Sequence, residues 1–453
     1  MSSQLNRFVL IVCIFELSNV GGLCWKWEYF TGILNAQDRT EIPANPQTKS
    51  ENRVQLLSAT EAREKVRKST EKMGLSLDGL TDLDAETASI LTETRGLLRL
   101  SGLRSLDEKT AESLTQNPGL LLSLNGLTSI TPRTASFLAR LRYLELNCLK
   151  PDAAVSRELG QVNGTLQLNA LQSLDVQTAA HLVKLTRKLS LNGVKSISSD
   201  VAKELAASRA VISLDGIEDL TDEAAAAIAT RPGGWSFGSL KRLQHSGLAR
   251  AIAMESRGVF LGKLDTVSLD CLVALTDCPD AVTLGIKELT KEEAEALSKC
   301  KLRLTLNRLP TVPEDAIEVL LDSSFSLHMP ALRELNNVEL AERLTQSSGY
   351  MFSVQKLESL SEPIAKVFTT KKGMLPLVKV KTIDLAVAKI LAEHPGNVVL
   401  SGLTEMSDEQ AEVFAGRQGK LFLSSETLMS EKARRLLSTN ENVTWKSVKN
   451  GSP

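Results

Sequence analysis

The sequence predicts an α/β solenoid, a stack of short parallel strands and short helices built from one repeated unit. Apolar pairs in the pattern Leu-x-Leu return at intervals of 22–24 residues along 75–232. A helix-capping residue stands seven positions after the second leucine of most units, and an alanine follows that residue by four positions. A unit this short cannot bury its apolar side alone, so fixed columns of this kind indicate stacking.

Residues 1–24 are typical of an export segment. Arg7 precedes the apolar run 8–15, which is too short for a transmembrane helix of about 20 apolar residues. A secretory signal peptide is therefore expected. A lipid anchor on Cys24 is the second interpretation. Lipidation signals place a small residue directly before the modified cysteine, and Leu23 departs from that pattern. A wrongly assigned start or a disordered tail is the third interpretation.

The polar, proline-containing stretch 25–56 predicts a flexible linker. Ser58 and Glu61 have the spacing of a capping box, which begins a charged helix over 59–72. The segment 57–74 is therefore expected to form an N-terminal capping helix that covers the first core layer, as the ends of solenoids require.

Each Leu-x-Leu predicts a strand of period two, in which both leucines face the core and the residue between them faces outward. The glycine two positions after the second leucine is expected to permit a turn that a side chain would resist. The second leucines are Leu77, Leu100, Leu124, Leu146, Leu168, Leu191 and Leu214.

The second half of each unit predicts a helix. Capping side chains accept the free amides of a helix start, at about 1 kcal/mol each. The alanine four positions later lies on the buried helical face and lets the helix approach the strands. The expected caps are Asp84, Asp107, Thr131, Asp175, Ser198, Thr221, Thr290, Ser361 and Ser407.

The pattern weakens after the regular repeats of 75–232. An irregular segment or a decayed repeat is expected over 233–266, and degenerate repeats over 267–440, beginning with a strand at 267–272. The remaining residues, 441–453, are expected to form a C-terminal tail.

This arrangement resembles the leucine-rich-repeat superfamily, in particular bacterial variants with strand-plus-helix repeats of 22–24 residues, over about residues 57–440. The resemblance implies that partners bind on the face formed by the strands. The chain departs from the common pattern three residues after the second strand leucine, where that pattern has asparagine. This sequence has Leu80, Leu103, Leu127 and Leu171 there.

The sequence offers no catalytic constellation. It contains no HExxH, GxSxG or P-loop motif, its four histidines are scattered, and its six cysteines form no CxxC. No catalytic residue, metal ligand or cofactor is therefore predicted, and the chain is not expected to be an enzyme. Cys271 and Cys278 could pair in an oxidising compartment.

The candidate binding surface is the outward row of the strands with its flanking residues. A solvated ladder of serine and asparagine is the alternative interpretation of the same residues. Trp235 and Phe237, in the irregular segment, form a second candidate. The surface comprises Ser76, Asp78, Arg99, Ser123, Asn125, Glu145, Asn147, Gln167, Asn169, Ser190, Asn192, Ser213 and Asp215.

These observations predict a non-catalytic, exported protein that binds a protein partner or acts as a scaffold. A passive structural component of the cell envelope is one alternative, and the substrate-selecting part of an enzyme is another. The formal net charge of −1, from 53 basic and 54 acidic residues, gives no electrostatic case for nucleic acid. Membrane contact is expected only through the N-terminal segment, if that segment is uncleaved or lipidated.

Overall fold

The computed structural model describes residues 57–69, 74–185, 187–254, 258–347 and 354–446. The export segment and the linker predicted for residues 1–56 lie outside the described residues.

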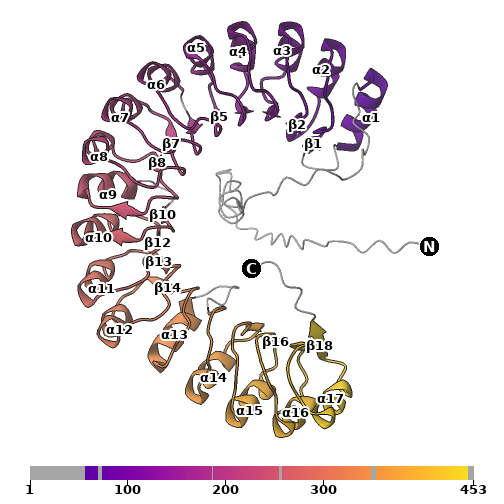
Figure 1. The fold of residues 1–453 in the computed structure, drawn as a ribbon, viewed down its shortest axis with the longest axis vertical. Coiled ribbons are helices and arrows are strands. Elements are labelled where there is room, and N and C mark those ends of the chain that lie inside the picture. The colour runs from indigo at the N-terminus through magenta and orange to yellow at the C-terminus, as the bar shows by residue number, and fades with distance from the viewer. Residues whose placement is uncertain (1–56, 70–73, 186, 255–257, 348–353, 447–453) are drawn as a thin grey trace, which may run out of the picture. The chain divides into compact units, whose positions relative to one another are not determined.

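Strands and helices alternate along the chain (Figure 1). The helices are α1 (Ala59–Ser69), α2 (Ala85–Leu91), α3 (Glu108–Leu114), α4 (Pro132–Leu138), α5 (Ala153–Leu159), α6 (Val176–Leu182), α7 (Ser199–Ala206), α8 (Asp222–Ala229), α9 (Ser246–Ala253), α10 (Leu269–Leu275), α11 (Lys291–Leu297), α12 (Glu314–Leu321), α13 (Val338–Ser347), α14 (Glu362–Thr369), α15 (Leu385–Glu393), α16 (Asp408–Ala415) and α17 (Glu431–Ser438). The strands are β1 (Gly74–Ser76), β2 (Leu97–Arg99), β3 (Leu121–Ser123), β4 (Tyr143–Glu145), β5 (Thr165–Gln167), β6 (Lys188–Ser190), β7 (Val211–Ser213), β8 (Trp235–Ser236), β9 (Arg242–Leu243), β10 (Val259–Leu261), β11 (Thr266–Val267), β12 (Ala281–Leu284), β13 (Arg303–Leu306), β14 (Ser326–His328), β15 (Leu375–Pro376), β16 (Val398–Leu400), β17 (Leu421–Ser424) and β18 (Val443–Lys446).

The strands of successive coils pair in parallel. Strands β1 to β8 form one sheet in chain order, and two four-stranded sheets have the orders β10-β12-β13-β14 and β15-β16-β17-β18. Leu98 pairs with Leu75 on one side and with Leu122 on the other, so the first units lie side by side. The helices of neighbouring coils pack together in a second layer (Figure 1). The predicted α/β solenoid, a leucine-rich-repeat-like stack, is confirmed.

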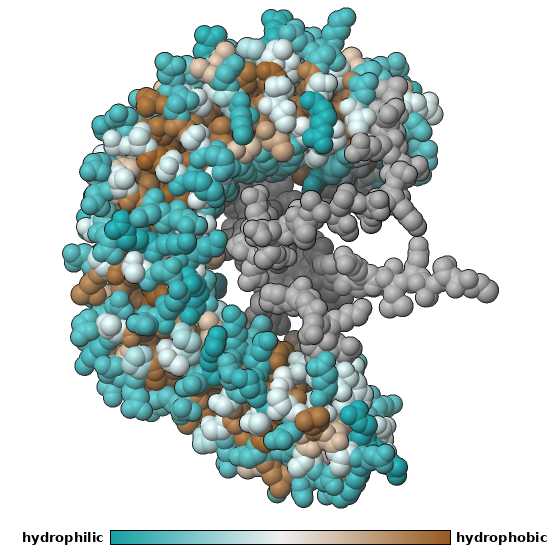
Figure 2. Space-filling view, in the orientation of Figure 1, coloured by the Kyte–Doolittle hydropathy of each residue, from teal (hydrophilic) through white to brown (hydrophobic). Residues whose placement is uncertain are grey.

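The core lies between the strand layer and the helix layer. The second leucines from Leu100 to Leu214 are fully buried, and the predicted alanine column is 0–3% exposed. The small alanine side chains let each helix approach its strand closely, while burial of each leucine contributes roughly 1.5–3 kcal/mol. Figure 2 shows hydrophilic side chains over most of the visible helix layer, with hydrophobic ones in the seams between coils.

The predicted caps begin the helices. The Asp84 carboxylate accepts a hydrogen bond from the Thr87 amide at 2.7 Å, and Thr290 and Ser407 head complete capping boxes. The box predicted at the start of α1 is present as well, since the Ser58 amide donates to the Glu61 carboxylate at 3.0 Å. Ser361 also precedes a helix, α14, but its side chain accepts no capping hydrogen bond.

The repeated glycines have a different role from the predicted one. Gly126, Gly193 and Gly216 do not adopt the left-handed backbone conformation. A Cβ built on Gly193 would instead lie 2.0 Å from the Asn169 carbonyl oxygen of the preceding coil. In the first described coil Gly79 has nothing within 4 Å of such a Cβ. These glycines therefore allow close approach between coils, rather than a special turn.

The segment 233–266 contains the strands β8 and β9, the helix α9 and the strand β10 of the next coil, and its last residue begins β11. Trp235 and Phe237 take the two core positions of the strand, since Trp235 pairs with Ile212 and both aromatic side chains are buried. The helix α9 begins after His245, whose Nδ1 accepts the Leu248 amide at 3.1 Å. This cap stands eight positions after the second core residue, and that one-residue offset hid the unit from the repeat pattern.

The strand predicted over 267–272 is wrong beyond its first residue. Ser268 caps a helix, and α10 covers Leu269–Leu275. Cys271 and Leu272 are buried on that helix, so the Leu-x-Cys pattern reflects a helical face. The strand of this coil is β10, in which Val259 and Leu261 are the buried positions.

Two other expectations change near the ends of the series. The range 441–453, predicted as a tail, contains β18, which pairs with β17 and packs Val443 and Trp445 against the core. Cys271 and Cys278 are both buried and free, so the disulfide considered for them is not formed.

Candidate functional site

Three rows of side chains face away from the core on the strand layer. The middle row stands between the two core residues of each strand and runs from Ser76 to Ser213. The ladder row follows the second core residue and runs from Asp78 to Asp215. The outer row precedes the first core residue and consists of Leu97, Leu121, Tyr143, Thr165, Lys188 and Val211. The middle and ladder rows are the predicted surface.

The ladder row joins the coils. Except at Ser101, each side-chain oxygen of this row accepts the backbone amide at the same position of the next coil, which satisfies a donor that would otherwise lie unpaired in the seam. The Ser101 hydroxyl is buried and has no hydrogen-bond partner among the described residues. The bonds run from Asn147 to Asn125 (2.9 Å), from Asn169 to Asn147 (3.2 Å), from Asn192 to Asn169 (2.9 Å), from Asp215 to Asn192 (3.1 Å) and from Gly238 to Asp215 (2.7 Å). The Ser101 amide likewise donates to Asp78 at 3.0 Å.

The serines of the middle row support this ladder. Ser190 donates to the Asn169 side chain at 2.9 Å, and Ser213 donates to the Asn192 side chain at 2.7 Å. Ser123 is buried and accepts a hydrogen bond from Asn125. The hydrogen-bonding capacity of these predicted site residues is therefore used within the stack.

The outer row brings apolar side chains to the same face. Leu97 pairs with Leu121, and Leu121 with Tyr143, across β2, β3 and β4. Leu121 is 37% exposed. In the middle row beside them, Arg99 lies 3.5 Å from the Asp78 carboxylate. We name Leu97, Arg99, Leu121, Tyr143, Glu145 and Gln167 the strand-face patch.

The hydroxyl of Tyr143 is held in place from two sides. It donates to Glu145 at 2.5 Å and accepts from the Gln167 amide at 2.9 Å. Burial raises the pKa of Tyr143, and the hydrogen bond to Glu145 and its negative charge raise the pKa further. The phenol therefore stays neutral through the physiological pH range, and the ring is fixed before any partner arrives.

The second predicted site is part of the core. Trp235 is 2% exposed and Phe237 is 1% exposed. The Trp235 indole donates to the Arg231 carbonyl at 3.2 Å, and the Arg231 guanidinium lies 4.0 Å from the indole ring. Both aromatic residues replace core leucines, so neither lies on a surface where a partner could touch it.

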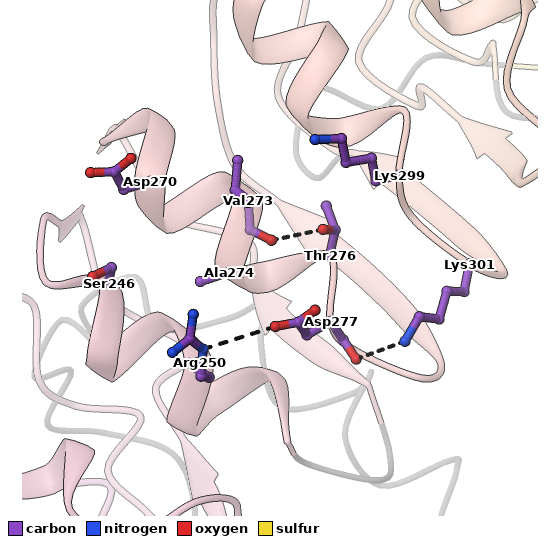
Figure 3. A pocket seen from close by; sticks show the side chains of 9 residues that line it. All are labelled: Ser246, Arg250, Asp270, Val273, Ala274, Thr276, Asp277, Lys299 and Lys301. Carbon is purple, nitrogen blue, oxygen red and sulfur yellow. Dashed lines mark hydrogen bonds and ion pairs between the residues drawn. The ribbon is translucent and has the colours of Figure 1, made fainter.

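A hollow of about 560 Å³ lies on the helix layer between α9, α10 and the residues that follow α11 (Figure 3). Arg250 and Asp277 approach to 3.9 Å, and Lys301 donates to the Asp277 carbonyl at 3.2 Å. Its lining contains no histidine or cysteine. Arg250, Asp277 and Lys301 therefore hold one another in place, and the lining offers no serine–histidine pair.

The described residues contain no group of three or more His, Cys, Asp or Glu side chains placed to hold a metal ion. No helix in the described part of the chain has both the length and the apolar character needed to cross a membrane.

The chain was compared with known proteins and structures. No family model matches it, and no curated protein matches it. Among solved structures, an internalin from Listeria monocytogenes matches with 16% identity and a TM-score of 0.34, over 86% of this chain and 95% of the internalin. A TLR13–ssRNA13 complex matches with 16% identity and a TM-score of 0.36, and the Drosophila Toll–Spatzle complex with 11% and 0.37. Each of these two matches covers 81% of this chain, but only 56% and 48% of the matched chain. The chain itself, by its parallel strands and repeated caps, has a leucine-rich-repeat-like fold.

Proposed function

We propose that this chain is a non-catalytic protein-binding repeat protein and that its partner docks on the strand-face patch. The supporting observation is the contiguous group of Leu97, Leu121 and Tyr143 on three adjacent strands. Tyrosine and arginine are enriched among the residues that provide most of the binding energy at protein interfaces. The two leucines beside Tyr143 add apolar area that binding would remove from water. A ring that is already immobilised loses little entropy on binding, so its contacts contribute more to affinity.

Replacing Leu121 and Tyr143 by alanine together is expected to weaken partner binding about tenfold or more, because truncated anchors typically cost over 1 kcal/mol each. The measurement is affinity capture from the source organism with quantitative mass spectrometry, followed by a Kd for the purified partner. The control replaces Leu269 and Val273 by alanine. They are two exposed apolar residues (46% and 42%) on α10 in the helix layer.

Thermal unfolding of both double variants would show that each is folded. A partner captured equally by the wild type and by both variants would contradict the docking site. If no protein were captured above background by the wild type, the binding function itself would be refuted. A passive envelope component would then be the better account, because the ladder and its serines need no ligand.

The proposal includes export, motivated by the basic residue and short apolar run at the start of the sequence. N-terminal sequencing of the mature protein after cell fractionation is expected to find it outside the cytoplasm, beginning after residue 20. An intact Met1 on protein confined to the cytoplasmic fraction would rule export out.

A further inference from the structure

One edge of the solenoid is strongly basic. It is formed by the loops that connect helix ends to the next strands in four successive coils, 139–142, 160–164, 183–187 and 207–210, together with Lys188, the first residue of β6. These loops contain no aspartate or glutamate. Their exposed cations, here named the basic edge, are Arg140, Arg142, Lys184, Arg187, Lys188 and Arg209.

The opposite edge of the same coils carries charges of both signs, including exposed Lys150 and Lys195. The turn 215–221, which connects a strand to its helix, holds Asp215, Glu218 and Asp219. The near balance of 53 basic and 54 acidic residues in the whole chain is therefore compatible with a local excess of cations on one edge.

The four loops are stacked on one another. The Thr165 amide donates to the Arg142 carbonyl at 2.9 Å, and the Lys188 amide donates to the Gly164 carbonyl at 3.1 Å. Gly164 stands between Arg142 and Arg187 in the stack and has no side chain to separate their guanidinium groups. Two coil spacings, at about 4.8 Å each, place these arginines roughly 10 Å apart along the edge.

Cations at this edge of a solenoid have an alternative, purely structural role, which is to neutralise the negative ends of the helices. Arg231 and Arg417 do so, since the Arg231 guanidinium donates to the Ser208 carbonyl at 2.7 Å and Arg417 donates to the Leu391 carbonyl. The six side chains of the basic edge form no ion pair with another described residue. Among the described residues, these six side chains make one ring interaction, in which the Arg140 guanidinium lies 4.9 Å from the centroid of the Phe137 ring.

We infer that the basic edge binds a linear acidic polysaccharide that runs across the coils. The planar arginine forks match carboxylate and sulfate groups, and a chain laid along the stack meets cations in three of the four coils, since the loop 160–164 contains none. Exposed Gln161 offers an amide to sugar hydroxyls. The four loops contain no aromatic residue, so they lack the stacking platform on which single-stranded nucleic acids depend. This surface borders the strand-face patch, since Arg142 directly precedes Tyr143 and Lys188 belongs to the outer row.

The test uses the full chain and a heparin octasaccharide as the probe, with binding measured by calorimetry. The edge variant combines Arg142→Gln, Arg187→Gln and Lys188→Gln. The matched control combines Arg104→Gln, Lys150→Gln and Lys195→Gln, which are exposed on the opposite edge. Both variants lose the same formal charge.

Wild-type affinity is expected to fall steeply between about 50 mM and 200 mM NaCl, as ion release requires. The edge variant should bind about tenfold more weakly and show a shallower salt dependence, while the control stays within about twofold of the wild type. Equal losses in both variants, or no wild-type binding at low salt, would overturn the inference. Poly(U) bound more tightly than heparin in an edge-dependent way would assign the surface to nucleic acid instead.

Discussion

Trp235→Ala is expected to lower the free energy of unfolding by about 3–5 kcal/mol, the usual cost of deleting a large buried aromatic side chain. The indole fills a core position that leucine holds in other coils and is 2% exposed. Its loss also removes the hydrogen bond to the Arg231 carbonyl and the contact with the Arg231 guanidinium. Urea unfolding monitored by circular dichroism would measure the change.

Phe260→Ala is the matched control for this prediction. Phe260 lies on β10, the core strand of the next coil, but its side chain is 50% exposed. Its removal is expected to change the free energy of unfolding by no more than about 0.5 kcal/mol. Similar losses in both variants would show that burial does not distinguish the two aromatic residues and would contradict the assignment of Trp235 to the core.

Gly193→Ala is expected to destabilise the protein by about 1–3 kcal/mol, because the added methyl group overpacks a backbone seam. Its Cβ would lie 2.0 Å from the Asn169 carbonyl oxygen and 2.6 Å from that of Leu171. Neither atom belongs to a flexible side chain, so one coil must shift against the other. The shift would also stretch the bond between the Asn169 side chain and the Asn192 amide.

Gly79→Ala provides the comparison in the first coil. No atom lies within 4 Å of its added Cβ, and its backbone is not left-handed. We expect this variant to be neutral, or stabilised by about 0.4–1 kcal/mol through lower entropy of the unfolded chain. Thermal unfolding of both variants decides the question. Equal destabilisation would mean that the glycines serve the turn itself.

The sequence predicted the features that each coil repeats by itself. The leucine columns, the alanines and the capping residues recur at fixed spacing, and they depend on local geometry that a spacing rule captures. The pattern failed at His245, where one added residue moves the cap. It also failed at Ser268, because Leu269 and Cys271 have the alternating spacing of a strand but lie in the first turn of a helix.

The features that depend on two coils were not predicted. Gly126 and Gly193 fit a turn rule equally well, and the carbonyl groups that exclude a side chain belong to the preceding coil. Other units have Ala170 and Cys148 at the repeat position of these glycines. The residue type at this position therefore does not reveal how closely two coils approach. The outer row was not included in the predicted surface. The period of two nevertheless places Leu121 on the same face as Ser123, and Tyr143 on the same face as Glu145.

The asparagine ladder constrains how a chain of this kind can change in length. From Asn125 to Gly238, successive seams use the same kind of side-chain oxygen and the same backbone amide, so these coils present equivalent ends to both neighbours. Excision of residues 169–191 would bring the Asn192 amide to the Asn147 oxygen and recreate the bond that was lost. Whole units of this part of the chain are thus interchangeable modules, whereas a deletion that removes only part of a unit would shift every later coil out of phase.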